Sequence, residues 1–456
     1  MNDVQNWAGR FVIVLGLARS GAAVAKLLHR LGAKVLVNEL KPRSECESAN
    51  ELESLGIQVI CGGHPDDLIS DEVDLVVKNP GIPYRAKPVQ QALGKGIPVI
   101  TEVEIAGLLS KGPIIGITGS NGKTTTTTLV GQMLTKGRVK NTVAGNIGQA
   151  LSDVVQTIEP DEWLVAELSS FQLKGTERFA PKIAALLNVF PAHLDYHQTL
   201  EDYISSKQKL FLNQTKEDVA IFNLENEICR QVAADCPGRV YWFSRSREVE
   251  RGVFVSSGMI TARMDEREFP VLPVSEVALK GTFNLENALA ATAISLAAGC
   301  PVSAIADVLR TFRGVEHRLE YVATVNGVSF YNDSKATNAQ AAAKALESFA
   351  EPVVWIGGGL DRGVDFKELV PVLKEKVKAM VAYGQTKDIL LERGKEADIK
   401  EVYTVSTLDE AVVLANRLAS AGDVVLLSPA CASWDQYTSF EERGSIFKQA
   451  VHSLQI

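Results

Sequence analysis

Short apolar runs alternate with amphipathic stretches along the first hundred residues. One of these stretches, Ala22–Leu31, has helical spacing. The runs with strand character are Phe11–Leu15, Lys34–Val37, Asp74–Val77 and Pro98–Ile100. Strands that alternate with helices favour a parallel sheet with helices on its faces. We therefore expect a Rossmann-like α/β domain over residues 1–111.

The alternation continues beyond Pro113. Asn284–Ala298 has the composition of a helix that ends at Gly299. Residues 239–280 contain short alternating runs with little helical period, which predicts a small β subregion. Further strands are expected at Trp163–Ala166, Ile183–Val189 and Val219–Phe222. The pattern predicts a second α/β domain with a mostly parallel sheet over residues 112–314.

A two-residue hairpin signal opens the last third of the chain. Asn326-Gly327 separates Tyr321–Val325 from Val328–Tyr331, and both flanking runs are apolar enough for strands. Later strands are expected at Val353–Ile356, Ala379–Tyr383 and Val424–Leu427. We expect a third, Rossmann-like α/β domain over residues 315–456.

Length and charge narrow the class of protein. A chain of 456 residues is too long for one ordinary core. It has no uninterrupted apolar window of membrane-spanning length, and Met1–Trp7 lacks the pattern of a secretion signal, so we expect a cytoplasmic protein with no membrane partner. The net charge is −8 without a Lys/Arg block, which argues against nucleic acid as a partner. Six cysteines without C-x-x-C spacing predict buried reduced thiols.

A glycine loop, Gly116–Thr124, lies between an apolar run and a helical stretch. In a strand–loop–helix context, backbone N–H groups and the helix N-terminus converge on an anion. Lys123 would reach nucleotide phosphates and Thr124 would bind Mg²⁺. Five residues separate Gly116 from Gly122, where the general phosphate-loop motif has four. The loop is therefore either a chance glycine turn or a variant with its own family.

Polar residues follow other predicted strands. Glu167 ends one of them and is a candidate Mg²⁺ ligand, with a dipole-stabilised helix carboxylate as the alternative. His193 follows the next strand, with a surface or capping role as the alternative. Lys207 and Lys209 lie on the helix that begins near Leu200, and a solvated helix face accounts equally well for both.

The loop Gly16–Gly21 resembles a dinucleotide-binding fingerprint, but Ala18 stands where the second glycine belongs. The methyl group argues against ordinary NAD binding, since that glycine lets the backbone approach a pyrophosphate. Asn38-Glu39 and Asn79-Pro80-Gly81 would line the same crevice at the ends of neighbouring strands.

Three segments of the last domain are candidates for phosphate or carboxylate binding. Arg and Lys beside Asp suit phosphate clamping and ribose hydroxyl bonding. The segments are His317-Arg318 with Asn332–Asn338, Gly357–Gly363, and Ser428–Asp435. Each taken alone is equally consistent with a structural turn.

The order of these motifs resembles the Mur ligases. The matching residues are Gly116–Thr124, Glu167–Phe171, His193, Asn284-x-x-Asn287-Ala288, His317-Arg318, Asp333–Asn338 and Ser428–Ser433. The five-residue gap in the glycine loop is that family's own pattern. Asn332–Asn338 and Leu427–Tyr437 resemble the members that add D-glutamate.

The resemblance implies an activity and its requirements. A D-glutamate-adding Mur ligase uses ATP and Mg²⁺ to join D-glutamate to UDP-N-acetylmuramoyl-L-alanine through an acyl phosphate, in cytoplasmic peptidoglycan precursor synthesis. A monomer is expected. The alternatives are another Mur ligase or a folylpolyglutamate synthetase. A NAD-dependent dehydrogenase would leave the Gly116–Thr124 loop unexplained, and a non-catalytic nucleotide-binding module would not need Lys123, Glu167, His193 and Lys207.

The resemblance also implies residue roles. Lys123, His193 and Lys207 would be catalytic, and the spacing Tyr203–Lys207 favours Lys207 over Lys209 as the lysine that the family carboxylates. ATP would contact Gly119, Ser120, Asn121, Gly122, Lys123, Thr124, Thr125, Asn146, Asn284, Asn287, Arg318, Asp333 and Lys335. The UDP substrate would contact Arg19, Ser20, Asn38, Glu39, Asn79 and Gly81. D-Glutamate would contact Thr337, Arg362, Ser433 and Phe440. Metal would be held by Thr124, Glu167, His193 and Lys207 as a carbamate. Some relatives have Lys where Arg362 stands, which changes the geometry offered to a carboxylate.

Overall fold

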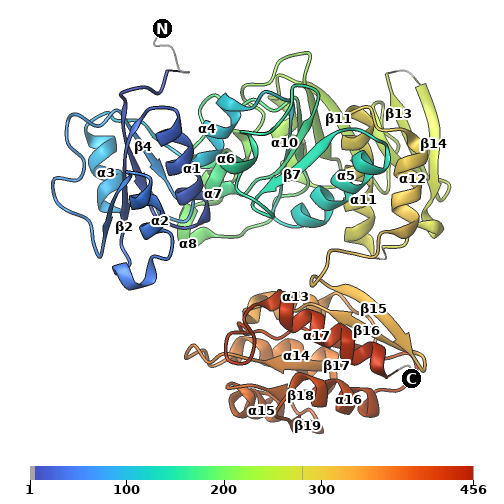
Figure 1. Ribbon diagram of the computed structural model, residues 1–456. Coiled ribbons are helices and arrows are strands. Elements are labelled where there is room, and N and C mark those ends of the chain that lie inside the picture. Colours follow the sequence, from blue (N-terminus) through green and yellow to red (C-terminus); the bar gives the residue numbers. More distant parts are fainter. Residues whose placement is uncertain (1–5, 266, 280, 455–456) are drawn as a thin grey trace. The chain divides into compact units, whose positions relative to one another are not determined.

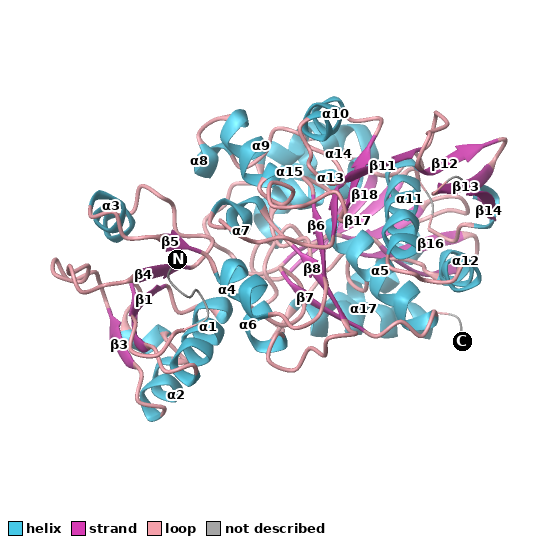
Figure 2. Ribbon diagram, turned by 90° about the horizontal axis from the view of Figure 1, so that it is seen from above, coloured by secondary structure: helices cyan, strands magenta, loops and turns pink. Residues whose placement is uncertain are grey.

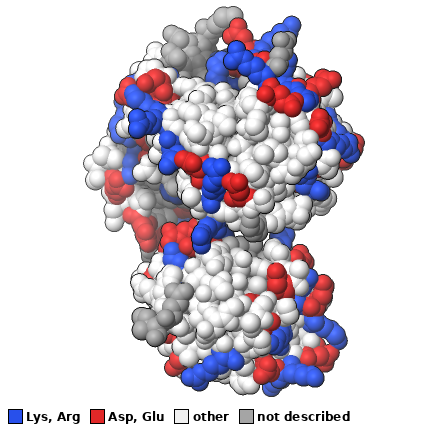
Figure 3. All heavy atoms as spheres, turned by 90° about the vertical axis from the view of Figure 1, so that its right-hand side faces the viewer, with Lys and Arg blue, Asp and Glu red and all other residues white. Residues whose placement is uncertain are grey.

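The computed structural model describes residues 6–265, 267–279 and 281–454. The first five residues, part of the segment in which no secretion signal was found, lie outside this set. The chain divides into two compact units, Met1–Phe312 and Arg313–Ile456. Among the described residues, no helix is long and apolar enough to cross a membrane. On the face drawn in Figure 3, acidic and basic side chains are interspersed.

The first unit begins with a five-stranded sheet in the order β3-β2-β1-β4-β5. All of its strand pairs are parallel, as the alternating pattern predicts. The strands are β1 (Phe11–Leu15), β2 (Lys34–Glu39), β3 (Gln58–Cys61), β4 (Leu75–Lys78) and β5 (Val99–Ile100). The helices are α1 (Arg19–Arg30), α2 (Ala49–Ser54) and α3 (Lys87–Gly94) (Figure 1).

A nine-stranded sheet forms the rest of this unit, in the order β14-β13-β12-β11-β10-β9-β6-β8-β7. The strands that surround the glycine loop are β6 (Ile114–Thr118), β7 (Asn141–Gly145), β8 (Trp163–Glu167), β9 (Ile183–Leu186) and β10 (Val219–Asn223). These five strands are parallel, so their carboxyl ends meet at one edge of the sheet. Figure 2 shows three of them, β6, β8 and β7, in this order. The helices are α4 (Glu102–Leu109), α5 (Lys123–Lys136), α6 (Leu151–Val154), α7 (Ser170–Lys174), α8 (Leu194–His197), α9 (Leu200–Gln208), α10 (Glu227–Ala234), α11 (Thr282–Ala297) and α12 (Val302–Thr311).

Residues 239–280 contain strands, as the prediction of a small β subregion requires. These four strands extend the central sheet, because β11 pairs in parallel with β10. The strands are β11 (Arg239–Ser244), β12 (Gly252–Ser256), β13 (Met259–Met264) and β14 (Arg267–Pro273). The last two pairings are antiparallel. Short alternating runs reveal strands, but they carry no information about which sheet the strands join.

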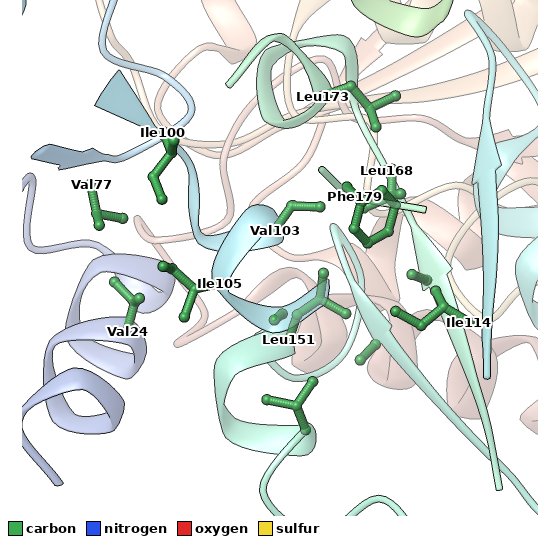
Figure 4. Packing of buried hydrophobic residues seen from close by; sticks show 14 of the residues in the cluster. Val24, Val77, Ile100, Val103, Ile105, Ile114, Leu151, Leu168, Leu173 and Phe179 are labelled. Carbon is green, nitrogen blue, oxygen red and sulfur yellow. The ribbon is translucent and has the colours of Figure 1, made fainter. Parts of the chain in front are cut away.

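One apolar core runs from the first sheet into the central sheet. Val103 and Ile105 of α4 lie between Val77 of β4 and Ile114 of β6 (Figure 4). All four side chains are buried. This continuous core explains why the first two sheets form a single compact unit.

The second unit contains a six-stranded sheet in the order β15-β16-β20-β17-β18-β19. The predicted hairpin is β15 (Glu320–Val325) with β16 (Val328–Asn332), paired antiparallel, and the other pairs are parallel. The remaining strands are β17 (Val353–Gly358), β18 (Val377–Tyr383), β19 (Glu401–Thr404) and β20 (Val424–Leu427). The helices are α13 (Ala339–Glu347), α14 (Val370–Lys376), α15 (Lys387–Glu396), α16 (Leu408–Leu418) and α17 (Phe440–Ser453). The predicted α/β fold is thereby confirmed, whereas the exact domain limits stay a prediction.

Candidate active site

The glycine loop connects β6, which ends at Thr118, to α5, which begins at Lys123. Asn188, just after β9, fixes the loop. Its carbonyl accepts from the Ser120 N–H at 2.9 Å, and its side-chain oxygen accepts from the Asn121 N–H at 2.8 Å. The first N–H groups of α5 have no acceptor within the helix, and the helix dipole adds positive potential there. These features suit the predicted phosphate-binding role of the loop.

At position 122 of the loop, the backbone conformation and the space around it require glycine. Its φ is +80°, and a Cβ atom there would lie 2.1 Å from Oδ1 of Asn287. Asn287 belongs to α11 and is itself buried. This close approach brings Asn287 beside the predicted phosphate site.

Two lysine side chains converge on one backbone carbonyl of the loop. The Lys123 Nζ donates to Gly119 O at 2.8 Å, and the Lys207 Nζ donates to the same oxygen at 3.0 Å. Lys207 is only 2% exposed, so the alternative of a solvated helix face is wrong for this residue. Burial, and then the charge of Lys123, hold the pKa of Lys207 well below its ordinary value. Both effects disfavour the charged form of the Lys207 amine.

Glu167 ends β8 beside β6 and β7, with Ile117 and Gly145 as its register partners. It is 1% exposed. Its Oε1 accepts a hydrogen bond of 2.8 Å from the Asn146 side chain, while Oε2 is buried and has no hydrogen-bond partner among the described residues. A buried carboxylate oxygen without a donor is the kind of atom that a hard cation would satisfy. With the buried Thr124 hydroxyl at the start of α5, this donor set fits Mg²⁺.

His193 immediately precedes α8 and adopts a left-handed backbone conformation, with φ +57°. Its ring lies 4.9 Å from the ring of Phe171, centroid to centroid. Phe171 belongs to α7, which follows Glu167 in sequence. His193 is exposed, and its predicted role as a metal ligand stays a prediction.

The predicted UDP-binding residues divide into two groups. Ser20 accepts from the Asn79 side chain at 3.2 Å, and Arg19 donates to Gly148 O in the loop after β7. Asn38 and Glu39 instead make internal contacts. Asn38 is buried and bonds Gly63 O and His64, while Glu39 accepts the Leu17 N–H at 2.6 Å. These two side chains shape the loops of this edge, and their direct contact with a substrate stays a prediction.

In the second unit, Asp333 follows β16 and is buried. It accepts hydrogen bonds from the Ser428 hydroxyl at 2.8 Å and the Leu319 N–H at 3.2 Å. Burial nevertheless raises the pKa of Asp333 to about 7, and these two donors and the charge of Arg318 only partly offset that effect. The Nε of Arg318 is buried and has no acceptor among the described residues. This pair has the charges and the unused donor that a nucleotide site needs.

The predicted D-glutamate residues lie in the same unit. The guanidinium of Arg362 stacks over Trp434 at 5.0 Å, and the Lys335 ammonium lies 5.2 Å from the ring centre of Phe440. Ser433 is buried, whereas Thr337 is partly exposed. The structure tests no ligand contact for these residues, so their roles stay predictions.

Residues 117–295 match the Mur ligase middle domain, residues 317–431 the glutamate ligase domain of Mur ligases, and residues 10–101 the MurD-like N-terminal domain. The UDP-N-acetylmuramoylalanine--D-glutamate ligase of Geobacillus kaustophilus strain HTA426 is 50% identical over 455 residues, which is 100% of both chains. The protein of that name from Bacillus cereus strain G9842 is 48% identical over 454 residues, again 100% of both.

The chain belongs to the Mur ligase family. It is therefore an ATP-dependent ligase. Among solved structures, the Thermotoga maritima UDP-N-acetylmuramate-alanine ligase has a TM-score of 0.55 and 20% identity, covering 97% of this chain and 99% of its own. A pseudomurein peptide ligase from Methanothermus fervidus has a TM-score of 0.53 and 16% identity, covering 98% and 100%. These two structures support the Mur ligase fold.

The structure of this Mur ligase brings together the predicted residues Lys123, Asn146, Glu167, Lys207 and Asn287. It also reveals supporting residues that the sequence analysis missed. Asn188 follows a strand, as polar site residues often do, and this position was the available signal. Arg443 is fully buried and donates to the Ser334 hydroxyl and carbonyl, at 2.9 and 2.7 Å. Nothing in the local sequence marks that arginine as a support for the Asp333–Asn338 loop.

Proposed function

We propose that this Mur ligase joins D-glutamate to the L-alanyl carboxylate of UDP-N-acetylmuramoyl-L-alanine, with ATP converted to ADP and phosphate. The observation that carries the proposal is full-length identity of about half to relatives named for this reaction. The setting would be peptidoglycan precursor synthesis in the cytoplasm, where ATP and nucleotide-linked substrates are available. Since one chain carries all the predicted binding residues, we propose a monomer.

The chemistry follows from the poor reactivity of a carboxylate toward amines. A carboxylate oxygen attacks the γ-phosphorus of ATP, ADP leaves, and an acyl phosphate forms. The amine of D-glutamate then attacks the acyl carbon, the C–O bond to phosphate breaks, and the amine gives up a proton. Such phosphoryl transfer needs positioning and charge neutralisation. The N–H groups at Gly119–Thr125 and the Lys123 ammonium would provide both.

One Mg²⁺ would be held by Thr124 and Glu167 and a second by His193, with Lys207 as a carbamate ligand. Bound Mg²⁺ would neutralise charge on the phosphate oxygens. The neutral Lys207 amine would add to CO₂ and lose a proton, which converts a nitrogen donor into an anionic oxygen ligand. The orphaned Glu167 Oε2 and the lowered pKa of Lys207 support this assignment.

The remaining proposed contacts are those with ATP, with the UDP substrate and with D-glutamate. Asn146, Asn284, Asn287, Arg318, Asp333 and Lys335 would contact ATP. Arg19, Ser20, Asn79 and Gly81 would contact the UDP substrate, with Asn38 and Glu39 at the same edge. Thr337, Arg362, Ser433 and Phe440 would surround D-glutamate.

Release of ADP with UDP-N-acetylmuramoyl-L-alanine and a panel of amino acids tests the proposal. We expect turnover with D-glutamate and none with L-glutamate, L-lysine or meso-diaminopimelate. Turnover with one of the others but not D-glutamate would refute the substrate assignment. Sedimentation at assay concentration would test the monomer.

A further inference from the structure

Lys78 is a buried lysine that the proposed reaction does not use. It is the last residue of β4 and is 1% exposed. It forms no ion pair with any carboxylate of the described residues. A cationic side chain is seldom buried without a charged partner, so its surroundings must satisfy it in another way.

Four oxygen atoms surround the Lys78 Nζ. They belong to Ile82 O at 2.9 Å, the Tyr196 hydroxyl at 3.0 Å, Pro80 O at 3.2 Å and Asn79 O at 3.4 Å. The Tyr196 hydroxyl in turn donates to Pro80 O at 3.1 Å. Three short contacts use all three N–H donors of an ammonium, whereas a neutral amine has only two. Burial, and then the charge of Lys174, lower the pKa of Lys78 to about 7, and its Nζ is bound to the loop through these oxygens.

Lys207 is the other buried lysine at this edge, and its surroundings differ. Its Nζ has two nearby oxygens, at 3.0 and 3.4 Å, whereas the Nζ of Lys78 has four. Of these two buried lysines, Lys78 is the one that holds together a loop of backbone carbonyls.

The loop that Lys78 holds lies at the predicted UDP site. Asn79 N–H donates to Leu15 O at 2.7 Å, and the Asn79 side chain donates to Ser20 at 3.2 Å. A Cβ on Gly16 would come within 2.8 Å of the Asn79 Cβ. The Asn79–Ile82 loop therefore packs directly against the Gly16–Ser20 loop, and its shape sets the space for the diphosphate.

Tyr196 connects the same lysine to the catalytic edge of the central sheet. It belongs to α8, which begins next to His193. The ring of Phe171 packs edge-on against Tyr196 at 4.4 Å and against His193 at 4.9 Å, centroid to centroid. A continuous set of contacts thus leads from the Lys78 ammonium through Tyr196 and Phe171 to His193.

We propose that Lys78 is a positioning residue that holds the Asn79–Ile82 loop against Tyr196. In this way Lys78 aligns the UDP substrate, and hence its carboxylate, with His193 and with the glycine loop Gly116–Thr124. The inference rests on the proposed function. It assigns to Lys78 and Tyr196 a role in binding the nucleotide-linked substrate, and none in binding ATP or D-glutamate.

The test compares Lys78→Met, Tyr196→Phe and the double variant with the wild-type protein. Lys78→Met keeps the length of the side chain and removes its charge. We expect it to raise the KM for UDP-N-acetylmuramoyl-L-alanine about tenfold, the scale of one lost charged hydrogen bond. The KM values for ATP and D-glutamate should change less than twofold. The double variant should match Lys78→Met, because both changes break one linkage.

Lys95→Met is the matched control, because Lys95 is an exposed lysine of the same domain that pairs with Asp71. It should leave all three KM values unchanged. A merely structural role for Lys78 would lower the melting temperature and the active fraction without a selective change in KM, and that result would overturn the inference. The inference would also be overturned if the increases in KM caused by the two single substitutions multiplied in the double variant. If Lys78→Met does not fold, an unchanged substrate KM in Tyr196→Phe overturns it equally.

Calorimetric titration with UDP alone separates this inference from the proposed function. A wild-type protein without D-glutamate turnover would refute the function. A weaker affinity for UDP in Lys78→Met than in Lys95→Met would still support the role of Lys78, and equal affinities would refute it.

Discussion

The side-chain amide of Asn146 donates a 2.8 Å hydrogen bond to one carboxylate oxygen of Glu167, while the other oxygen is buried without a partner. Glu167 ends β8, and Asn146 immediately follows the neighbouring parallel strand β7, so the sheet itself sets their distance. One oxygen is thereby oriented and the other is left for a cation. This pair is the clearest structural support for a metal site in the protein.

Glu167→Gln should retain the fold and lose the reaction. The substitution keeps the shape and the contact to Asn146, but it removes the charge a cation needs. We expect kcat to fall about 100-fold or more, the scale of losing one electrostatic contact to the transferred group. The melting temperature should stay equal or rise, since a buried unpaired charge disappears. The exposed Glu159→Gln should behave as the wild type, and a Glu167→Gln enzyme with full kcat would contradict the metal role.

Lys207→Ala should be inactive and partly restored by short carboxylic acids such as acetate. The cavity left by the side chain would admit an acid whose oxygens replace those of the carbamate. Lys209→Ala is the matched control on the same stretch of chain. Its ammonium donates to Lys174 O and Thr176 O, both at 2.8 Å, so its loss should cost about 1–3 kcal/mol of stability without any rescue. Equal rescue of both variants, or of neither, would argue against the carbamate.

Gly122→Ala should impair ATP binding more than its backbone strain alone predicts. Both Gly122 and Gly258 have positive φ, +80° and +76°, but a Cβ at Gly258 would meet nothing within 4 Å. Gly258→Ala therefore measures the free-energy cost of placing a non-glycine residue at positive φ, which is about 1 kcal/mol. Gly122→Ala adds the collision with Asn287 and should raise the KM for ATP at least tenfold relative to Gly258→Ala. Similar KM values in the two variants would show that the Gly122–Asn287 contact is unimportant.

Asp333 should make ATP binding dependent on pH near neutrality. Its pKa is raised to about 7 by burial, so the carboxylate gains a proton as the pH falls through 7. If the ionised form binds ATP, the KM for ATP should rise several-fold from pH 8 to pH 6. Asp333→Asn should have a high KM that is flat over this range. A wild-type KM for ATP that is constant from pH 6 to pH 8 would contradict the assignment.

Sequence patterns predicted most strands and the residues at their ends, because burial and turn chemistry are local properties. Val424–Leu427 and the Asn326-Gly327 hairpin were correct, whereas the sheet partner of residues 239–280 was not predictable from local alternation. Burial of individual lysines also escaped the sequence analysis. Lys207 and Lys209 lie two residues apart on one segment, and only tertiary packing places Lys207 against Gly119. Lys78 lacked any signal, since its partners are three backbone carbonyls and the hydroxyl of Tyr196, which is distant in sequence.

The central claim is that phosphoryl transfer activates the substrate carboxylate. It is tested most directly with UDP-N-acetylmuramoyl-L-alanine labelled with ¹⁸O in both carboxylate oxygens. Mass analysis of the products after turnover with ATP and D-glutamate should find one ¹⁸O in each phosphate released and one in the new amide. Phosphate without ¹⁸O would contradict an acyl phosphate intermediate. It would also contradict the role in phosphoryl transfer that is assigned to the glycine loop Gly116–Thr124.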